Sequence, residues 1–162
     1  MLPLWCEPDS GLRVGLLTEP EEIEKLVRLF EDVADAQGWQ PEGALRLWLA
    51  RSVYFALEVN GKLAGGLQLA LPDSQGGLPC QVVWPEVSIH NAGRCAHVCM
   101  MSLAESYRGE NAHFWRLAAE MWRYCVEGSI ATLFMVLIYL TQRRISPSAY
   151  PCSCGTTNSI LT

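Results

Sequence analysis

Tyr107, Arg108 and Gly109 stand directly before a helix-forming segment and are residue types that bind a phosphate group. The start of a helix exposes unpaired backbone N–H groups and about half a positive charge, which together attract anions. An arginine there adds a full charge and a fork of donors. A glycine lets a ligand approach the main chain closely. The segment therefore predicts a pyrophosphate site at the start of a helix over residues 111–127. The alternative is a simple helix entry with a surface arginine.

The first half of the chain predicts the elements that lie before this turn. Residues 13–17 favour a strand, and apolar residues at helical spacing favour a helix that begins after a Thr18–Glu21 capping box and ends at Gly38. A shorter helix is expected over 41–51. Asn60-Gly61 is a strong turn signal and predicts a hairpin of strands 53–59 and 62–71. Gly65-Gly66 in the return strand indicates a bulge or a close approach by another group.

The second half predicts the elements that hold the turn. Residues 72–94 are expected to be a long loop with at most one strand, at Val82 to Trp84, and such a loop is either functional or a surface excursion. A buried strand over 96–103 precedes the turn, and a strand over 130–140 follows the helix. In the helix, ion pairs Arg116–Glu120 and Arg123–Glu127 are expected on the outer side. The expected inward stripe is Phe114, Leu117, Ala118, Met121, Trp122 and Cys125. The order β-α-α-β-β-β-α-β is that of an α/β (α+β) fold.

Composition limits the class of protein. The 162 residues fit one domain, 50% of them are hydrophobic, and the net charge is −5 without a basic cluster, so a nucleic-acid partner is disfavoured. The longest apolar run, over 131–140, is shorter than the roughly 20 residues of a membrane span, so no membrane partner is expected. The N-terminus lacks the cationic start of a signal peptide, and we expect a cytoplasmic protein.

Seven cysteines raise the question of a metal. Reduced thiols are the default in a chain of this size. Cys95, His97 and Cys99 share one face of an extended strand but lie too far apart to converge on one ion without a bend. Cys152 and Cys154 are spaced more tightly than a usual zinc knuckle. We therefore expect no metal, with a zinc-binding protein as an alternative.

The composition changes after Glu127, because no acidic residue follows it. From Ser146 onward the chain is rich in Ser and Thr and shows little periodicity. We expect one domain over residues 1–140 and an atypical, weakly ordered tail over 141–162. A change of reading frame in the gene is one hypothesis for this tail.

The segment from Met101 to His113 resembles the signature of the GNAT superfamily of N-acyltransferases, which runs Leu-Ala-Val-x-Pro-x-Tyr-Arg-Gly-x-Gly-Leu-Gly. The resemblance covers roughly residues 13–138. It implies a mixed, largely antiparallel sheet flanked by helices, and a turn that holds the pyrophosphate of coenzyme A while the pantetheine arm follows the strand before it. The cofactor-binding residues that it implies are Met101, Ser102, Leu103, Arg108, Gly109, Glu110, Asn111, Ala112 and His113.

The sequence departs from the family pattern in two places. Asn111 and His113 stand where the family has its second and third glycines, and the bulk of His113 either narrows the site or donates a hydrogen bond to an anion. This departure leaves acetyl-CoA, a longer acyl-CoA and an acyl carrier protein open as donors. The chain after residue 136 also lacks the family's tyrosine motif, which protonates the leaving thiolate.

The resemblance implies direct transfer of an acyl group to a small-molecule amine. Such a reaction needs a general base, and we rank Glu86 and His97 first, each against an ordinary structural role. Backbone N–H groups near Met100 and Met101 are the candidates for polarising the thioester. A catalytically inactive module of the same fold is the alternative. An unpaired strand at 130–138 would favour a homodimer.

Overall fold

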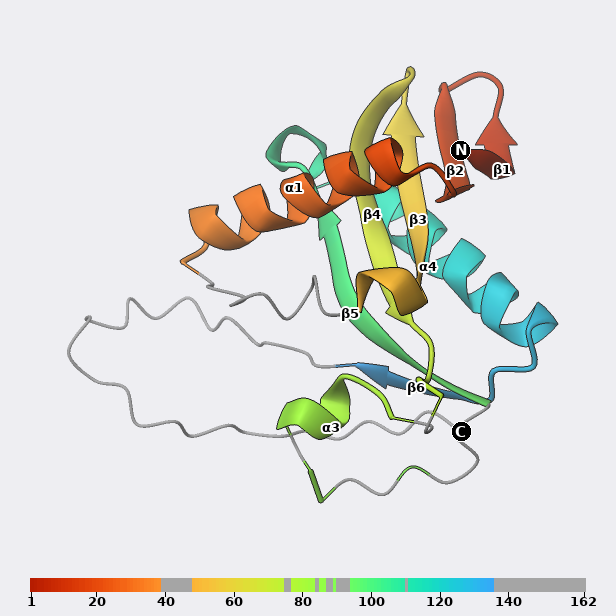
Figure 1. Cartoon of the computed structure of the whole chain (residues 1–162). Coiled ribbons are helices and arrows are strands. Elements are labelled where there is room, and N and C mark those ends of the chain that lie inside the picture. The colour runs from red at the N-terminus through yellow and green to blue at the C-terminus, as the bar shows by residue number, and fades with distance from the viewer. Residues whose placement is uncertain are drawn as a thin grey trace.

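The computed structural model describes residues 1–38, 48–74, 77–83, 85–86, 89, 94–109 and 111–135. Six strands there form one sheet in the order β1-β2-β3-β4-β5-β6 (Figure 1). Neighbouring strands are antiparallel except β5 and β6, which are parallel. The largely antiparallel mixed sheet predicted from the sequence is thus confirmed. The strands are β1 (Leu2–Glu7), β2 (Leu12–Leu17), β3 (Ser52–Val59), β4 (Lys62–Ala70), β5 (Cys95–Leu103) and β6 (Thr132–Met135).

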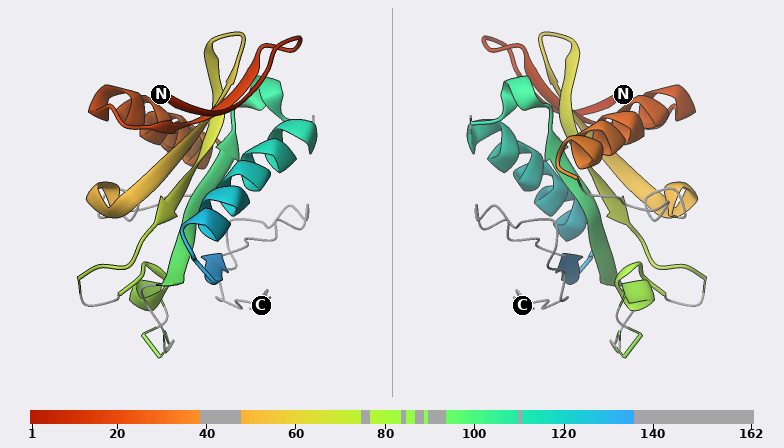
Figure 2. Two further views of the ribbon diagram at one scale, coloured as in Figure 1. Left: turned by 90° about the vertical axis from the view of Figure 1, so that its right-hand side faces the viewer. Right: turned by 90° about the vertical axis from the view of Figure 1, so that its left-hand side faces the viewer.

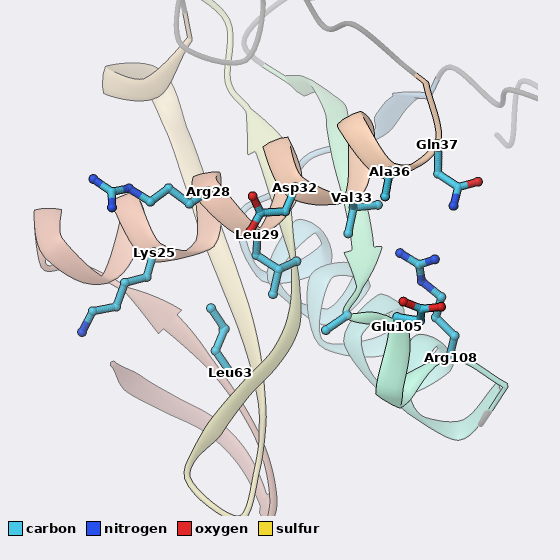
Figure 3. Close-up of a pocket in the computed structure, with 11 residues that line it drawn as sticks. Lys25, Arg28, Leu29, Asp32, Val33, Ala36, Gln37, Leu63, Glu105 and Arg108 are labelled. Carbon is cyan, nitrogen blue, oxygen red and sulfur yellow. The ribbon is translucent and has the colours of Figure 1, made fainter.

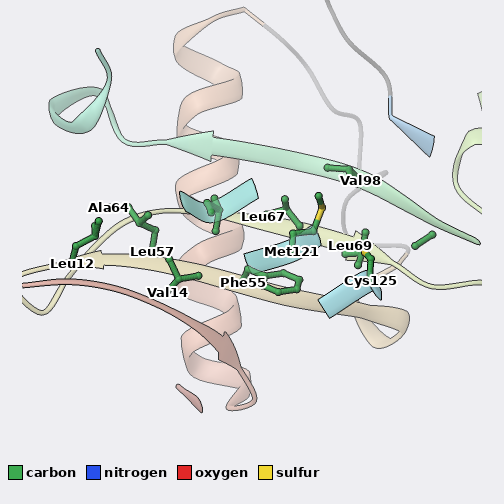
Figure 4. Close-up of a cluster of buried hydrophobic side chains, with 12 residues drawn as sticks. Leu12, Val14, Phe55, Leu57, Ala64, Leu67, Leu69, Val98, Met121 and Cys125 are labelled. Carbon is green, nitrogen blue, oxygen red and sulfur yellow. The ribbon is translucent and has the colours of Figure 1, made fainter. Parts of the chain in front are cut away.

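Two long helices cover opposite faces of the sheet (Figure 2). They are α1 (Pro20–Ala36) and α4 (Asn111–Glu127), and a short helix α3 (Cys80–Val83) lies in the β4–β5 connection. On the α1 face, Leu26, Val27 and Phe30 are fully buried against the sheet. On the α4 face, Leu117, Met121 and Cys125 join a larger apolar cluster (Figure 4). The molecule is therefore a three-layer α/β/α arrangement.

The start of α1 differs from the sequence prediction. Glu19 is the N-cap and makes no side-chain cap hydrogen bond, while the Thr18 hydroxyl donates to the Glu19 carboxylate at 3.4 Å. The predicted Thr18–Glu21 capping box is therefore wrong, because the first helical residue is Pro20. A proline fits that position since its fixed φ is helical and its missing N–H is not needed there. The end is as predicted, with Gly38 at φ 69°.

The β3–β4 hairpin is confirmed. Asn60 and Gly61 have φ values of 52° and 74°, as a two-residue turn of the I′ type requires. The close approach predicted at the glycine pair is also present. A Cβ atom on Gly66 would lie 2.5 Å from Leu26 Cδ1 and 2.5 Å from the Phe55 carbonyl oxygen. Gly66 thus lets α1 pack directly on the middle of the sheet.

Strand β1 is an element that the sequence did not predict. It pairs with β2 through a register shift between Pro3 and Trp5. A Cβ atom on Gly15 of β2 would lie 2.6 Å from the Leu2 carbonyl oxygen, so the glycine is what allows β1 to pair closely here. A proline and a bulge interrupt the alternation by which strands are recognised, which explains why β1 was missed.

Helix α4 has the predicted bounds but only part of the predicted inward face, with Leu117, Met121 and Cys125 buried as predicted. Phe114 and Trp122 are 40% and 54% exposed, whereas Glu120 is 4% exposed. Glu120 binds Arg116 at 2.7 Å as predicted, but its second partner is Arg123, at 2.7 Å, instead of an Arg123–Glu127 pair. Arg116 also stacks over the Trp5 ring at 3.5 Å. The helix is therefore rotated so that a buried carboxylate, held by two arginines beside β1, replaces part of the apolar stripe.

Several predictions fall partly outside the described residues. Of the helix expected over 41–51, the structure describes a 3₁₀ turn at Leu49–Arg51. The strand suggested at 82–84 is wrong, because residues 80–83 are helical. The strand over 130–140 is confirmed for Thr132–Met135, while the tail over 141–162 lies outside the described part. Dimerisation through the β6 edge of the sheet stays a prediction, because residues 136–162, which follow β6 directly, lie outside the described part. None of the described helices has the length and apolar character to cross a membrane.

Candidate functional site

The two halves of β5 have different partners. Cys95 to Val98 pair with Thr132 to Met135 of β6 on one edge. On the other edge, His97 and Val98 pair with Ala70 and Leu69 of β4. From Cys99 to Leu103, the described pairing is with β4 alone, and a register shift marks the change. Bulges of this kind re-aim a strand and are frequent beside active sites. The second half of β5 therefore presents an open edge within the described part of the chain.

Backbone groups of Met101 and Leu103 lie on this open edge. The Ala104 N–H donates to the Ala64 carbonyl of β4 at 2.9 Å, so Ala104 and, by alternation, Ser102 direct their backbone groups toward β4. Met101 and Leu103 consequently direct their N–H and C=O groups away from it. Unpaired backbone groups of a strand are a template for pairing with an extended ligand. The predicted residues Met101 and Leu103 are thus placed where such a ligand would pair.

Arg108 and Gly109 lie at the end of this edge, after a 3₁₀ turn over Glu105–Tyr107. Arg108 Nε donates to the Leu103 carbonyl at 3.0 Å, and the side chain is otherwise exposed. Gly109 has φ 98°, a conformation that side-chain-bearing residues avoid, and a Cβ atom there would meet nothing within 4 Å. The guanidinium and a stretch of accessible backbone therefore stand together before the first turn of α4.

The first turn of α4 begins at Asn111, as predicted. Ala112 is exposed, whereas His113 is 9% exposed and its ring contacts the Tyr107 ring edge to face, with centroids 6.2 Å apart. The bulky ring that replaces a family glycine is thus turned into the molecule and packed on Tyr107. Glu110 lies outside the described residues, as does the side chain of Asn111.

A cavity of about 620 Å³ lies between α1 and the 104–108 turn (Figure 3). Its volume is in the range of small-molecule pockets. Arg108 lines it and so connects it to the turn before α4. The other charged side chains in its lining are Lys25, Arg28, Asp32 and Glu105. The sequence did not single these residues out as a site, although the helical spacing of Lys25, Arg28 and Asp32 on the polar side of α1 was a usable signal.

The two candidate bases lie at the opposite end of β5. His97 is six residues before Leu103, which at about 3.3 Å per residue is roughly 20 Å along the strand. It is 5% exposed, and burial lowers its pKa to about 4. Its Nδ1 atom has no hydrogen-bond partner in the structure as described. Glu86 is exposed in a turn after α3, and Figure 1 shows α3 near the opposite end of the sheet from the end of β5. The structure thus separates these residues from the predicted cofactor turn.

The cysteines near β5 are unreactive thiols. Burial raises the pKa of Cys99 to about 11 and raises the pKa of Cys80 and Cys95 as well. A thiol with a raised pKa is a poor nucleophile and a poor metal ligand, since both roles need the thiolate. Among the described residues, no group of three or more His, Cys, Asp or Glu side chains is placed to hold a metal ion. Cys152 and Cys154 lie outside them.

Comparison with solved structures finds the same architecture in several proteins. The N-acyl amino acid synthase FeeM from uncultured soil microbes aligns with a TM-score of 0.63 and 19% identity, over 78% of this chain and 71% of that one. An aminoglycoside acetyltransferase from an uncultured soil metagenomic sample, in complex with trehalose, aligns with 0.58 and 15%, over 83% of each chain. A GNAT acetyltransferase from Brucella melitensis in complex with acetyl-CoA aligns with 0.57 and 13%, over 82% of this chain and 80% of that one.

The chain has the GNAT fold. No protein-family model and no curated protein match its sequence, so the likeness is one of structure. The GNAT resemblance noted at 101–113 falls on the open half of β5 and the start of α4. The part of the sequence that most resembles the GNAT superfamily therefore lies where, among the described residues, the edge of β5 away from β4 has no partner strand.

Proposed function

We propose that this GNAT-fold chain transfers an acyl group from coenzyme A, or from an acyl carrier protein, to a small amine. The observation that carries the proposal is the continuity between the open edge of β5 and the cationic turn at Arg108 and Gly109. An extended donor with a phosphate at one end and amides along its length matches that surface. Among the structural neighbours, one is named as an N-acyl amino acid synthase and another is bound to acetyl-CoA.

The donor would be held by backbone and by one side chain. Arg108 and the N–H groups of the first turn of α4 would bind the phosphate, with Gly109 leaving room for it. The Met101 carbonyl and the Leu103 N–H would pair with the amides of the donor arm. Because His113 is packed on Tyr107, the ligand would meet main chain at this turn rather than the imidazole ring.

The reaction would be a direct displacement. The amine nitrogen attacks the thioester carbonyl carbon, the C–N bond forms, the C–S bond breaks, and a proton passes from the amine to the departing thiolate. A free edge N–H, such as that of Met101, is suited to stabilise the oxygen of the tetrahedral intermediate. With a pKa of about 4, His97 is neutral at physiological pH and can accept a hydrogen bond, but it is a weak base.

The alternative function is an inactive GNAT-fold module that binds the same donor. The burial of His97 favours it, because a pKa of about 4 makes this residue a weak base and a module that only binds needs no base. Isothermal titration with coenzyme A tests what both functions share. Thiol release from acetyl-CoA and from a longer acyl-CoA, with a panel of amines, separates them. Binding without amine-dependent thiol release would support the module, and no binding of coenzyme A would overturn both.

A further inference from the structure

Charged side chains of both signs line the cavity between α1 and the 104–108 turn (Figure 3). Arg28 is already partnered, since its Nε atom binds the Glu24 carboxylate at 3.1 Å. The side chains of Lys25, Asp32 and Glu105 form no hydrogen bond or ion pair in the part of the chain that the structure describes. The contact that Arg108 makes there is the bond from Nε to the Leu103 carbonyl, which leaves the ends of its guanidinium unused.

These unpaired charges are balanced. Two cations, Lys25 and Arg108, stand with two carboxylates, Asp32 and Glu105, around one space. Lys25 and Asp32 come from α1, whereas Glu105 and Arg108 come from the turn on the other wall. Opposite charges that surround a cavity without binding one another can each bind a ligand group of the other sign. A ligand that matches this arrangement carries both an ammonium group and a carboxylate.

The rest of the lining is apolar apart from Gln37. Leu29 and Val33 of α1, together with Leu63 and Ala104 from the sheet side, are half-buried in the wall of the cavity. Leu29 and Val33 follow Lys25 and Asp32 along the same side of the helix, next to the face that packs on the sheet. A ligand that covers half-exposed apolar side chains is bound more tightly, because removing apolar surface from water is favourable. The cavity thus has space for an apolar group beside its charges.

From this juxtaposition of balanced, unpaired charges and an apolar wall, we propose that the cavity is a binding site for a small zwitterion with an apolar side chain, such as an aliphatic amino acid. The carboxylate binds Lys25, and the ammonium group binds Asp32 or Glu105. The apolar side chain lies against Leu29. The inference goes beyond the proposed transferase function and does not rest on it, because no step uses an acyl donor.

The probes that test this site differ by one charged group each. L-leucine carries both charges, isopentylamine lacks the carboxylate, and 4-methylpentanoate lacks the amine, while all three keep the same branched chain. Titration of the full chain, in the absence of coenzyme A, should give a dissociation constant for leucine at least tenfold lower than for either analogue. Amide shifts in a labelled sample should localise to α1 and to residues 104–108.

Two variants and a control complete the test. Lys25→Gln and Asp32→Asn change exposed side chains on α1 and should each weaken leucine binding about tenfold, the effect of one charged hydrogen bond. Glu127→Gln, exposed at the end of α4 on the opposite face of the sheet, should leave binding unchanged. Absence of leucine binding up to about 10 mM would overturn the proposal. So would equal binding of the three probes, or binding unchanged in both α1 variants.

The outcome is separate from that of the transferase proposal. A chain that binds leucine but not coenzyme A would support the cavity and remove the transferase. A chain that binds coenzyme A but not leucine would do the reverse. If saturating coenzyme A abolished leucine binding, the cavity would be a part of the cofactor site, and its assignment as a separate site would be overturned.

Discussion

The two halves of β5 differ in both strand pairing and side-chain burial. Cys95 to Val98 are buried and pair with β6 on the edge away from β4, whereas Cys99 to Leu103 are half-buried and have no described partner there. A strand with both edges paired contributes to stability, and a strand with a free edge has hydrogen-bonding groups to offer a ligand. Side-chain burial and ligand access therefore change together within nine residues.

The largest effect that tests this comparison is expected in the buried half. Ala96→Leu adds three carbon atoms where the side chain is fully buried in the cluster with Leu117 and Met121, and should lower the free energy of unfolding by about 3 kcal/mol. Met101→Leu, a volume-conserving change in the half-buried open half, should cost less than about 1 kcal/mol. Urea denaturation of both variants measures the difference. Equal losses would contradict the division of β5 into two halves.

The next effect concerns the pH dependence of stability. Burial lowers the pKa of His97 from 6.5 to about 4. Between pH 6.5 and pH 4, the unfolded chain therefore binds a proton at this residue that the folded chain does not bind. Stability should therefore fall as the pH drops from about 6.5 toward 4. Between pH 7 and pH 5, His97 should account for a loss of about 2 kcal/mol.

His97→Leu removes this proton uptake and isolates its contribution. Urea denaturation should show that the free energy of unfolding of the wild type falls about 2 kcal/mol further than that of the variant on going from pH 7 to pH 5. Carboxylates titrate equally in both chains and cancel in the comparison. A constant difference between the two chains over this range would show that His97 is not held neutral by burial.

The smallest effect is expected in the open half, and it concerns binding rather than stability. Arg108→Gln should weaken coenzyme A binding about tenfold, or about 1.4 kcal/mol, and leave the urea midpoint unchanged because the side chain is exposed. Arg94→Gln is a matched control. Arg94 is also exposed, and its Nε atom donates to the Ser129 carbonyl at 3.2 Å, but it lies at the other end of β5. A similar loss in both variants would point to net charge rather than to a site.

Local signals explain what the sequence predicted well. The Asn60-Gly61 turn needs two positive φ angles, which few residue pairs accept, so the hairpin was predictable. The bounds of α4 were predicted because an apolar period and Gly128 mark them. The start of α4 after Tyr107-Arg108-Gly109 was predicted because a family motif precedes it, whereas cofactor binding by this turn stays a prediction. The confirmed predictions thus depend on residues that are close together in the chain.

The errors depend on partners far away in the chain. Glu120 is buried because Arg116 and Arg123 bind it, and Arg123 also donates to the Leu4 carbonyl of β1 at 3.0 Å. Nothing near Glu120 in the sequence announces that strand. In the same way, the cavity combines Asp32 with Glu105, and their proximity follows from how α1 crosses the sheet. Periodicity gives the face of a helix, but the packing partner decides which polar residues that face can bury.

The sequential order of the sheet has a consequence for how the chain folds. From β1 to β5, each strand pairs with the strand beside it in the chain, so these contacts close comparatively short loops. The parallel pairing of β6 must wait for α4 to cross over, and loop-closure entropy makes such pairing slow. We therefore expect strands β1 to β5 to pair early. The pairing of β5 with β6, which ends before Met101, should form late. Damage to α4 would then disturb the pairing of β6 with β5 before it cost the chain the rest of its sheet.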